Sequence, residues 1–286
     1  TLRELLRNPF HLKIFLEIAK PGEVFESFPR LLDRLWEERI VKETEAEKSI
    51  TFLTKLAERM TKEEVLWLPA AIADECPKIC RSLEKAGILM TNPDNSTLGF
   101  CHQTLYDHTL ARSFARGSQS LSDFVLERQD GLFIRPILLR NLNYLRATTP
   151  GQYQKQLRIL LDTSKQQVRA HIRILLIEFV GAQSNPDTVE VGLLVPLLNS
   201  EEAIKVLDSM MGSPGWFRKL RDRPEFLQWL EKPVEQAVYC CPILTAAASF
   251  AAEDVWILLE EYWLNDKTYD FLSIRVIGNI NQWTPQ

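Results

Sequence analysis

The long carboxyl-terminal stretch, residues 118–286, constrains the fold most, because it contains only helix-type patterns. Its apolar residues recur at helical spacing in segments of roughly 12 to 18 residues, such as QVRAHIRILLIEFVGA and EEAIKVLDSMMG. Polar or proline-bearing turns separate these segments, and neither strand alternation nor a glycine-rich loop interrupts them. The order of helix, turn and helix predicts an irregular, HEAT-like α-solenoid with no measurable repeat length.

Residues 1–45 are also helical in pattern, with one break. Pro9 has no backbone donor and clashes with a preceding turn, so it cannot stand inside a helix. The sequence therefore predicts a short helix, a break at Asn8-Pro9, and a second helix capped by Asn8. A third helix is expected over FESFPRLLDRLWEERIVKE, with Pro29 near its first turn.

Residues 46–117 follow a different pattern. The helix SITFLTKLAERMT precedes the short β-prone EEVLWLP, the short helices PAAIADE and PKICRSLEKAG, and two apolar stretches joined by the turn-rich residues 92–96. A last helix follows. Helix, strand, helix, helix, β-hairpin and helix in about seventy residues is the order of a winged-helix domain. The expected fold is thus mainly α, in three domains: 1–45, 46–117 and 118–286.

Composition excludes several function classes. Basic and acidic residues number 34 and 38, for a net charge of −4, so no global positive field attracts nucleic acid or an anionic membrane. Five cysteines without disulfide-like spacing indicate a reducing compartment, and no apolar run approaches the roughly 20 residues that span a bilayer. We expect a cytoplasmic protein without a membrane partner. Because the chain begins at Thr1 rather than Met, we expect a piece of a longer protein.

Motifs of phosphate and metal chemistry are missing. The sequence contains no GxxxxGK[ST] loop, no GxGxxG after a strand and no HExxH, so we expect this chain not to be an enzyme. Cys76, Cys80, Cys101 and His102 could converge on zinc, but they lack the CxxC spacing of structural zinc sites. We therefore expect no metal site.

His102 and His108 lie in FCHQTLYDHTLARSF, six residues apart, so they cannot form the i, i+4 ligand pair of a metal-binding helix. The apolar stripe of the predicted helix runs through Tyr106, Leu110 and Phe114, which leaves His108 toward the polar side. His102 falls at the amino-terminal edge, where it could share an anion such as a phosphate with the helix end. The alternative, favoured by the residues alone, is that His102 caps its own helix or fills a domain interface.

The helix PKICRSLEKAG carries Lys78, Arg81 and Lys85 at the place of a winged-helix recognition helix. This pattern offers DNA binding as an alternative function. The acidic Glu84 and the negative net charge weigh against it, so nucleic acid is not the partner we expect.

Two segments resemble a known family. LLRNPFHLKIFLEIA is similar to the segment that opens the helical lid domain of NACHT-type STAND nucleotide-binding switch proteins. FCHQTLYDHTLARSF resembles the end of the winged-helix domain of that family, although His108 stands where the family commonly has Tyr or Phe. The resemblance covers roughly the first 117 residues.

The resemblance implies a division of roles. Pro9 would pack on the adenine ring, and His102 would contact the β-phosphate of ADP to hold the resting state. The nucleotide-binding core with its Walker motifs would lie upstream in the same chain, and ATP and ADP would bind only to that longer parent. The carboxyl-terminal array would sense a protein or ligand. The expected function is the non-catalytic regulatory and sensor part of a switch in signal transduction or defence; the alternatives are a DNA-binding winged helix with a solenoid, or a plain interaction scaffold.

Overall fold

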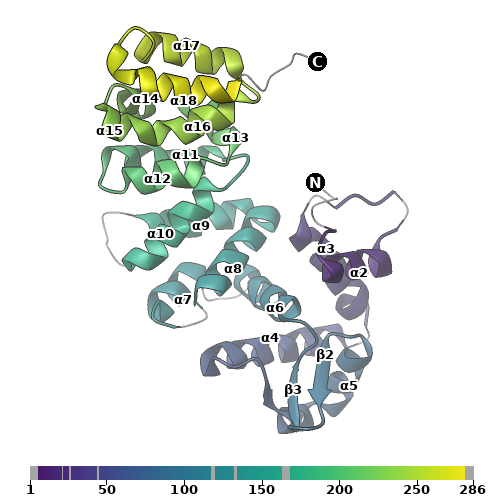
Figure 1. Cartoon of the computed structure of the whole chain (residues 1–286). Coiled ribbons are helices and arrows are strands. Elements are labelled where there is room, and N and C mark those ends of the chain that lie inside the picture. Colours follow the sequence, from purple (N-terminus) through teal and green to yellow (C-terminus); the bar gives the residue numbers. More distant parts are fainter. Residues whose placement is uncertain are drawn as a thin grey trace. The chain divides into compact units, whose positions relative to one another are not determined.

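The computed structural model describes residues 6–20, 22–25, 27–43, 45–116, 120–131, 134–162 and 168–280, apart from the side chains of residues 279 and 280. They are mostly helical, with one small three-stranded antiparallel sheet, so the predicted mainly α class is confirmed (Figure 1). The chain divides into two compact units, Thr1–Ile159 and Leu160–Gln286.

The first described helix confirms the predicted break at Pro9. Helix α2 (Pro9–Ile18) has proline in its first turn, and the Asn8 side chain accepts a hydrogen bond from the Phe10 backbone N–H at 2.9 Å. The helix predicted before Asn8 lies mostly outside the described residues. Helix α3 (Phe28–Trp36) likewise has Pro29 in its first turn and continues into a π-helical turn, Glu37–Val41.

The small sheet has the strand order β1-β3-β2. Strands β2 (Leu89–Asn92) and β3 (Thr97–Phe100) form the predicted hairpin, with Leu89 opposite Phe100. Strand β1 (Leu68–Pro69), within the segment predicted to be β-prone, pairs with the other edge of β3. Pro69 sits on an outer strand, where its missing N–H costs no ladder bond.

Helix α6 (Gln103–Arg116) is the central element of the first unit, because it contacts α3, α4 and α8. Every residue from Leu105 to Ala111 is buried. The expectation that His108 lies toward a polar face is therefore wrong: the helix is covered on several sides, and His108 is only 4% exposed. The remaining α-helices of the first unit, the last of which runs past the division between the units, are α4 (Ala46–Glu63), α5 (Pro77–Lys85), α7 (Leu121–Arg128), α8 (Ile134–Thr148) and α9 (Pro150–Leu161).

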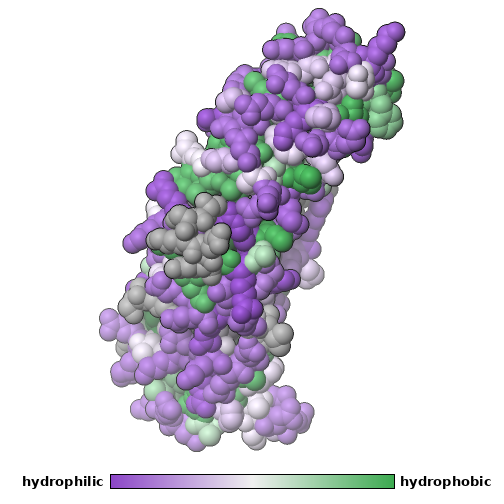
Figure 2. Space-filling model, turned by 90° about the vertical axis from the view of Figure 1, so that its left-hand side faces the viewer, coloured by the Kyte–Doolittle hydropathy of each residue, from purple (hydrophilic) through white to green (hydrophobic). Residues whose placement is uncertain are grey.

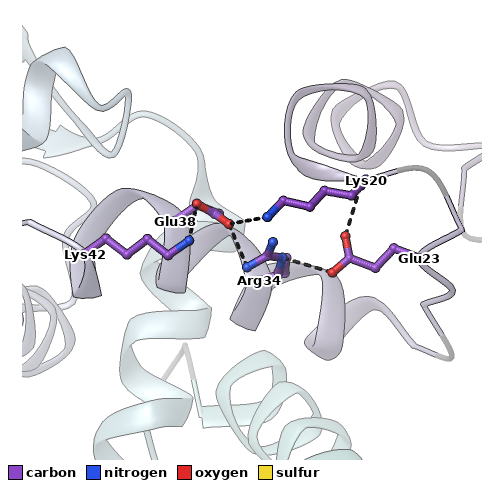
Figure 3. A network of polar contacts seen from close by, with 5 residues as sticks. All are labelled: Lys20, Glu23, Arg34, Glu38 and Lys42. Atoms are coloured by element: carbon purple, nitrogen blue, oxygen red, sulfur yellow. Dashed lines mark hydrogen bonds and ion pairs between the residues drawn. The ribbon is translucent and has the colours of Figure 1, made fainter.

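A network of charged side chains joins the end of α2 to α3 (Figure 3). The Arg34 guanidinium lies 3.1 Å from the Glu23 carboxylate and 2.7 Å from that of Glu38, and Lys42 lies 2.7 Å from Glu38. The Lys20 backbone N–H donates to Glu23, and its ammonium lies 3.9 Å from Glu38. Ion pairs with access to solvent contribute only about 0–1 kcal/mol each, so this network of partly exposed side chains adds little to stability.

The second unit is a succession of short helices in which α10 packs on α12 and α16 packs on α18. Three buried tryptophans link sequence-distant turns, each donating its indole N–H to a backbone carbonyl: Trp216 to Val180 at 3.3 Å, Trp229 to Leu198 at 2.8 Å and Trp263 to Leu230 at 2.9 Å. These links span 36, 31 and 33 positions along the chain. The α-helices are α10 (Ala170–Gly181), α11 (Thr188–Leu194), α12 (Ala203–Met210), α13 (Pro214–Leu220), α14 (Pro224–Leu230), α15 (Val234–Ala237), α16 (Cys241–Ala248), α17 (Ala252–Tyr262) and α18 (Asp270–Ile280).

The boundary between the two units falls within α9, so α7 and α8 belong to the same compact unit as α2 to α6. The three domain ranges drawn from the sequence stay predictions.

The face drawn in Figure 2 is mainly hydrophilic, and hydrophobic side chains appear on it in small separate groups. None of the helices in the described ranges has both the length and the apolar character needed to cross a membrane.

Candidate functional site

The segments that carry the two residues predicted to contact nucleotide meet in the first unit. Phe10, which directly follows Pro9, stacks on the His102 ring with 3.7 Å between ring centroids and 9° between ring planes. Pro9 is exposed at the start of α2, and His102 is exposed just before α6. Residues more than ninety positions apart therefore meet at the junction of two helix amino termini.

His102 has a local structural role. Its Nδ1 atom accepts a hydrogen bond from the Thr104 backbone N–H at 3.1 Å, so the side chain caps α6. This contact confirms the alternative that His102 caps its own helix. Partial burial, with smaller contributions from His11 and Arg140, lowers the pKa of His102 and favours the neutral ring that can accept this bond.

A buried polar cluster lies deeper, where α3, α6 and α8 meet. One carboxylate oxygen of Asp33, Oδ1, pairs with the Arg112 guanidinium, accepts a hydrogen bond from the Tyr144 hydroxyl at 3.1 Å, and lies 3.5 Å from His108 Nε2. The guanidinium of Arg112 also lies over the Trp36 ring at 5.1 Å. A single carboxylate thus joins side chains from three helices.

His108 behaves as an aromatic core residue in this cluster. Its ring meets Trp36 and Tyr144 edge-on, at centroid distances of 5.6 and 5.3 Å. Burial, reinforced by the nearby Arg112, holds the pKa of His108 well below its usual value, so the ring is neutral. Burial also raises the pKa of Tyr144 to about 12.

A second ion pair ties α6 to α8. The carboxylate of Asp107, which is 6% exposed, pairs with the Arg140 guanidinium. Removing either partner would leave a charge without compensation, which is costly for the buried carboxylate.

Sequence reasoning missed this polar cluster. One signal was available in the expected resemblance: the proteins that FCHQTLYDHTLARSF resembles commonly have Tyr or Phe at the position of His108, and an aromatic residue there favours packing over exposure. Asp33 and Tyr144 lie 111 positions apart, and no local pattern connects them.

The candidate zinc ligands make other contacts. The Cys101 thiol donates to the Leu89 carbonyl at 2.9 Å, and burial raises the pKa of Cys80 to about 11, which disfavours the thiolate that binds metal. Among the residues with described positions, no group of three or more His, Cys, Asp and Glu side chains could hold a metal ion.

The basic side chains of α5, on Lys78, Arg81 and Lys85, are exposed. The acidic Glu84 turns instead to the hairpin, where its carboxylate accepts a hydrogen bond from the Thr91 hydroxyl at 2.5 Å.

Comparisons with protein-family models, with curated proteins and with solved structures found no match to this chain.

Proposed function

We propose that this chain is the regulatory and sensor part of a STAND-type nucleotide switch, with a helical lid (1–45), a winged-helix domain (46–117) and a HEAT-like array (118–286). The observation that carries the proposal is the contact between Phe10 and His102, because it gathers the two resembling motifs into one place. Pro9 would contact the adenine ring, and His102 would contact the β-phosphate of ADP held by an upstream core. The chain itself would hydrolyse no nucleotide.

In the proposed resting state, the ring nitrogen of His102 that does not cap α6 contacts the phosphate. Since Nδ1 of His102 accepts the Thr104 N–H, Nε2 is the ring nitrogen that can carry the proton and donate to a phosphate oxygen. ADP would hold the lid and α6 together in the resting state, and exchange for ATP would release the winged helix as a rigid unit. The helical array would bias this equilibrium through its own partner or ligand.

The test separates capping from phosphate contact. In the longer parent protein, His102→Ala removes the cap and the phosphate contact, whereas His102→Asn keeps a good capping side chain and loses the imidazole. Both variants should release ADP during native purification, as measured by chromatography of the extracted nucleotide. Gln103→Ala, at the adjacent exposed position, is the matched control and should retain ADP. Retention of ADP by the His102→Asn variant at the wild-type level would contradict the proposed contact between His102 and the phosphate.

DNA binding through α5 is the second candidate, favoured by the hydrogen bond that draws Glu84 away toward Thr91 and leaves three exposed cations. It predicts duplex binding that weakens as salt rises and that Arg81→Gln and Lys85→Gln reduce. The absence of a complex in a gel-shift assay at low salt would contradict DNA binding through α5.

A further inference from the structure

The last two described helices, α17 and α18, lie at one end of the second unit and expose large apolar side chains (Figure 1). On α17, Trp256 is 46% exposed and Ile257 is 53% exposed; on α18, Phe271 and Ile274 are each 69% exposed. Both helices pack on α16 through their other sides. Several large apolar side chains exposed on one helix pair are typical of a surface that meets a partner.

One face of α17 is exposed along the length of the helix, and its residues lie three or four positions apart. We call this set the outer face of α17, and its members are Glu253, Trp256, Ile257, Glu260 and Glu261. The opposite side of the helix is buried through Val255, Leu258 and Leu259. The outer face therefore presents a tryptophan and an isoleucine between carboxylates.

The charge of this outer face is entirely negative. Helix α17 contains four acidic residues and no basic one. Asp254 pairs with Arg221 and is not part of the outer face. Within the described part of the chain, none of the three carboxylates of the outer face pairs with a cation, and the one of Glu261 interacts with the neutral Tyr262 hydroxyl. Three negative charges without compensation thus surround two exposed apolar side chains.

Helix α17 is fixed at both ends. Near its start Asp254 makes its ion pair, and after its end the buried Trp263 donates to the Leu230 carbonyl at 2.9 Å. In the connection to α18, the Tyr269 hydroxyl donates to the Lys232 carbonyl at 3.0 Å. A surface that is already held in place loses little conformational entropy when a partner binds to it.

The negative charge distinguishes between kinds of partner. Nucleic acid and anionic membranes would be repelled by this face. A second copy that met the face with its own outer face would set three carboxylates against three, because a two-fold interface pairs a surface with itself. A helix that carries Lys and Arg beside an apolar stripe complements both the charge and the apolar side chains.

We propose that the outer face of α17, with the exposed apolar side chains of α18, binds a basic amphipathic helix of a partner protein. Apolar residues of that helix pack on Trp256 and Ile257 and extend to Phe271 and Ile274, while its Lys and Arg side chains contact the carboxylates. The tryptophan is the anchor, since tryptophan is enriched among the residues that contribute most to binding. The proposal gives a partner class to the sensor role proposed for the array, and it rests on that role only for its regulatory meaning.

The test uses a fluorescein-labelled peptide of about 18 residues made of Leu and Lys, with Leu at positions i, i+3, i+4 and i+7. The full chain is titrated into it, and binding is followed by fluorescence anisotropy. The control peptides have Glu in place of Lys, or the same residues in an order without an apolar face. The basic amphipathic peptide should bind at least about tenfold more tightly than either control. Equal binding of a control peptide overturns the proposal, as does absence of binding at about 1 mM chain.

Apolar variants locate the binding. Trp256→Ser/Ile257→Ser should weaken it at least about tenfold. Ile204→Ser/Met211→Ser is the matched control, because both residues are exposed apolar side chains at α12 of the same unit, and it should bind as the wild type does. Equal affinity of the two double variants overturns the proposal.

Charge variants decide the matter even where a serine variant does not fold. Glu253→Gln/Glu260→Gln should weaken binding about three- to tenfold at low salt and should reduce its dependence on salt. Glu201→Gln/Glu235→Gln, at exposed positions elsewhere in the unit, is the matched control and should do neither. Equal affinity and equal salt dependence of these two variants overturn the proposal.

Two further measurements separate the alternatives. Analytical ultracentrifugation of the chain alone should show no dimer that Trp256→Ser/Ile257→Ser removes; such a dimer would assign the face to a second copy and overturn the proposal. His102→Asn should leave the affinity for the basic peptide unchanged. Peptide binding and ADP retention can therefore fail separately.

Discussion

Two helical glycines in the second unit should respond oppositely to the same substitution. Gly181 ends α10 where it meets α12, and a Cβ atom added there would lie 1.9 Å from Ser209 Oγ and 2.5 Å from Ser209 Cβ. Gly192 lies inside α11, and an added Cβ would meet no heavy atom within 4 Å apart from its chain neighbours and the backbone of its own helix. Gly181→Ala should therefore destabilise the second unit, and Gly192→Ala should stabilise it.

The magnitudes follow from these distances. Real Cβ atoms do not approach other atoms to 1.9 Å, so α10 and α12 must separate locally, and overpacking of this kind costs about 1–3 kcal/mol. At Gly192 only the helix preference for alanine remains, which is about 0.5–1 kcal/mol in favour of folding. The double variant Gly181→Ala/Ser209→Gly removes both nearest clashing atoms and should recover part of the loss, so the two changes should be non-additive.

Thermal unfolding followed by circular dichroism measures these effects. Gly181→Ala should lower the midpoint by roughly 4–8 °C for about 2 kcal/mol, and Gly192→Ala should raise it by a few degrees at most, on the order of 2–4 °C. Unfolding by urea, followed by tryptophan fluorescence, should rank the stabilities of the two variants and the wild type in the same order. A Gly181→Ala midpoint equal to or above the wild-type value would refute the close approach of α10 and α12.

Substitutions at three further positions test other contacts. Trp229→Phe removes the indole donor to the Leu198 carbonyl and should cost about 1–3 kcal/mol in urea unfolding, because a buried acceptor loses its partner. Asn8→Ala should cost about 0.5–2 kcal/mol of stability by removing the α2 cap, whereas Asn8→Ser should lose much less by the same measurement. Since burial lowers the pKa of His108 in the folded state, the unfolded chain binds the proton first, and stability should fall as pH drops below about 6.5, by at most about 1.4 kcal/mol per pH unit. His108→Phe should flatten this acid-side loss in thermal unfolding between pH 7 and about 5, and an unchanged profile would contradict it.

The elements of the first unit could be predicted because local signals agree there. Pro9 and Pro29 mark helix starts, and Gly87 follows α5 with a φ of +68°, a conformation that favours glycine. The turn-rich residues 92–96 place the hairpin. Each of these features depends on backbone preferences that act within a few residues.

The candidate site was only partly predictable. His102 could be placed at a helix start from its own segment, and the structure puts it there. The burial of His108 was not predictable. The sequence pattern places His108 on the polar side of α6, and that side is buried because α3 and α8 cover it. Asp33, the carboxylate at the centre of the cluster, lies in a helix whose sequence pattern gives no sign of partners on α6 and α8.

The three buried tryptophans that donate to carbonyls in the second unit can serve as internal fluorescent probes of its packing. Each indole is at most 4% exposed and is bonded to a carbonyl 31 to 36 positions earlier, so its fluorescence depends on the separation of those two turns. If every other tryptophan of the chain is replaced by phenylalanine so that only one of these three remains, its fluorescence reports on a single junction. Stretching or compression of the array by a bound partner could then be read junction by junction, without an attached label.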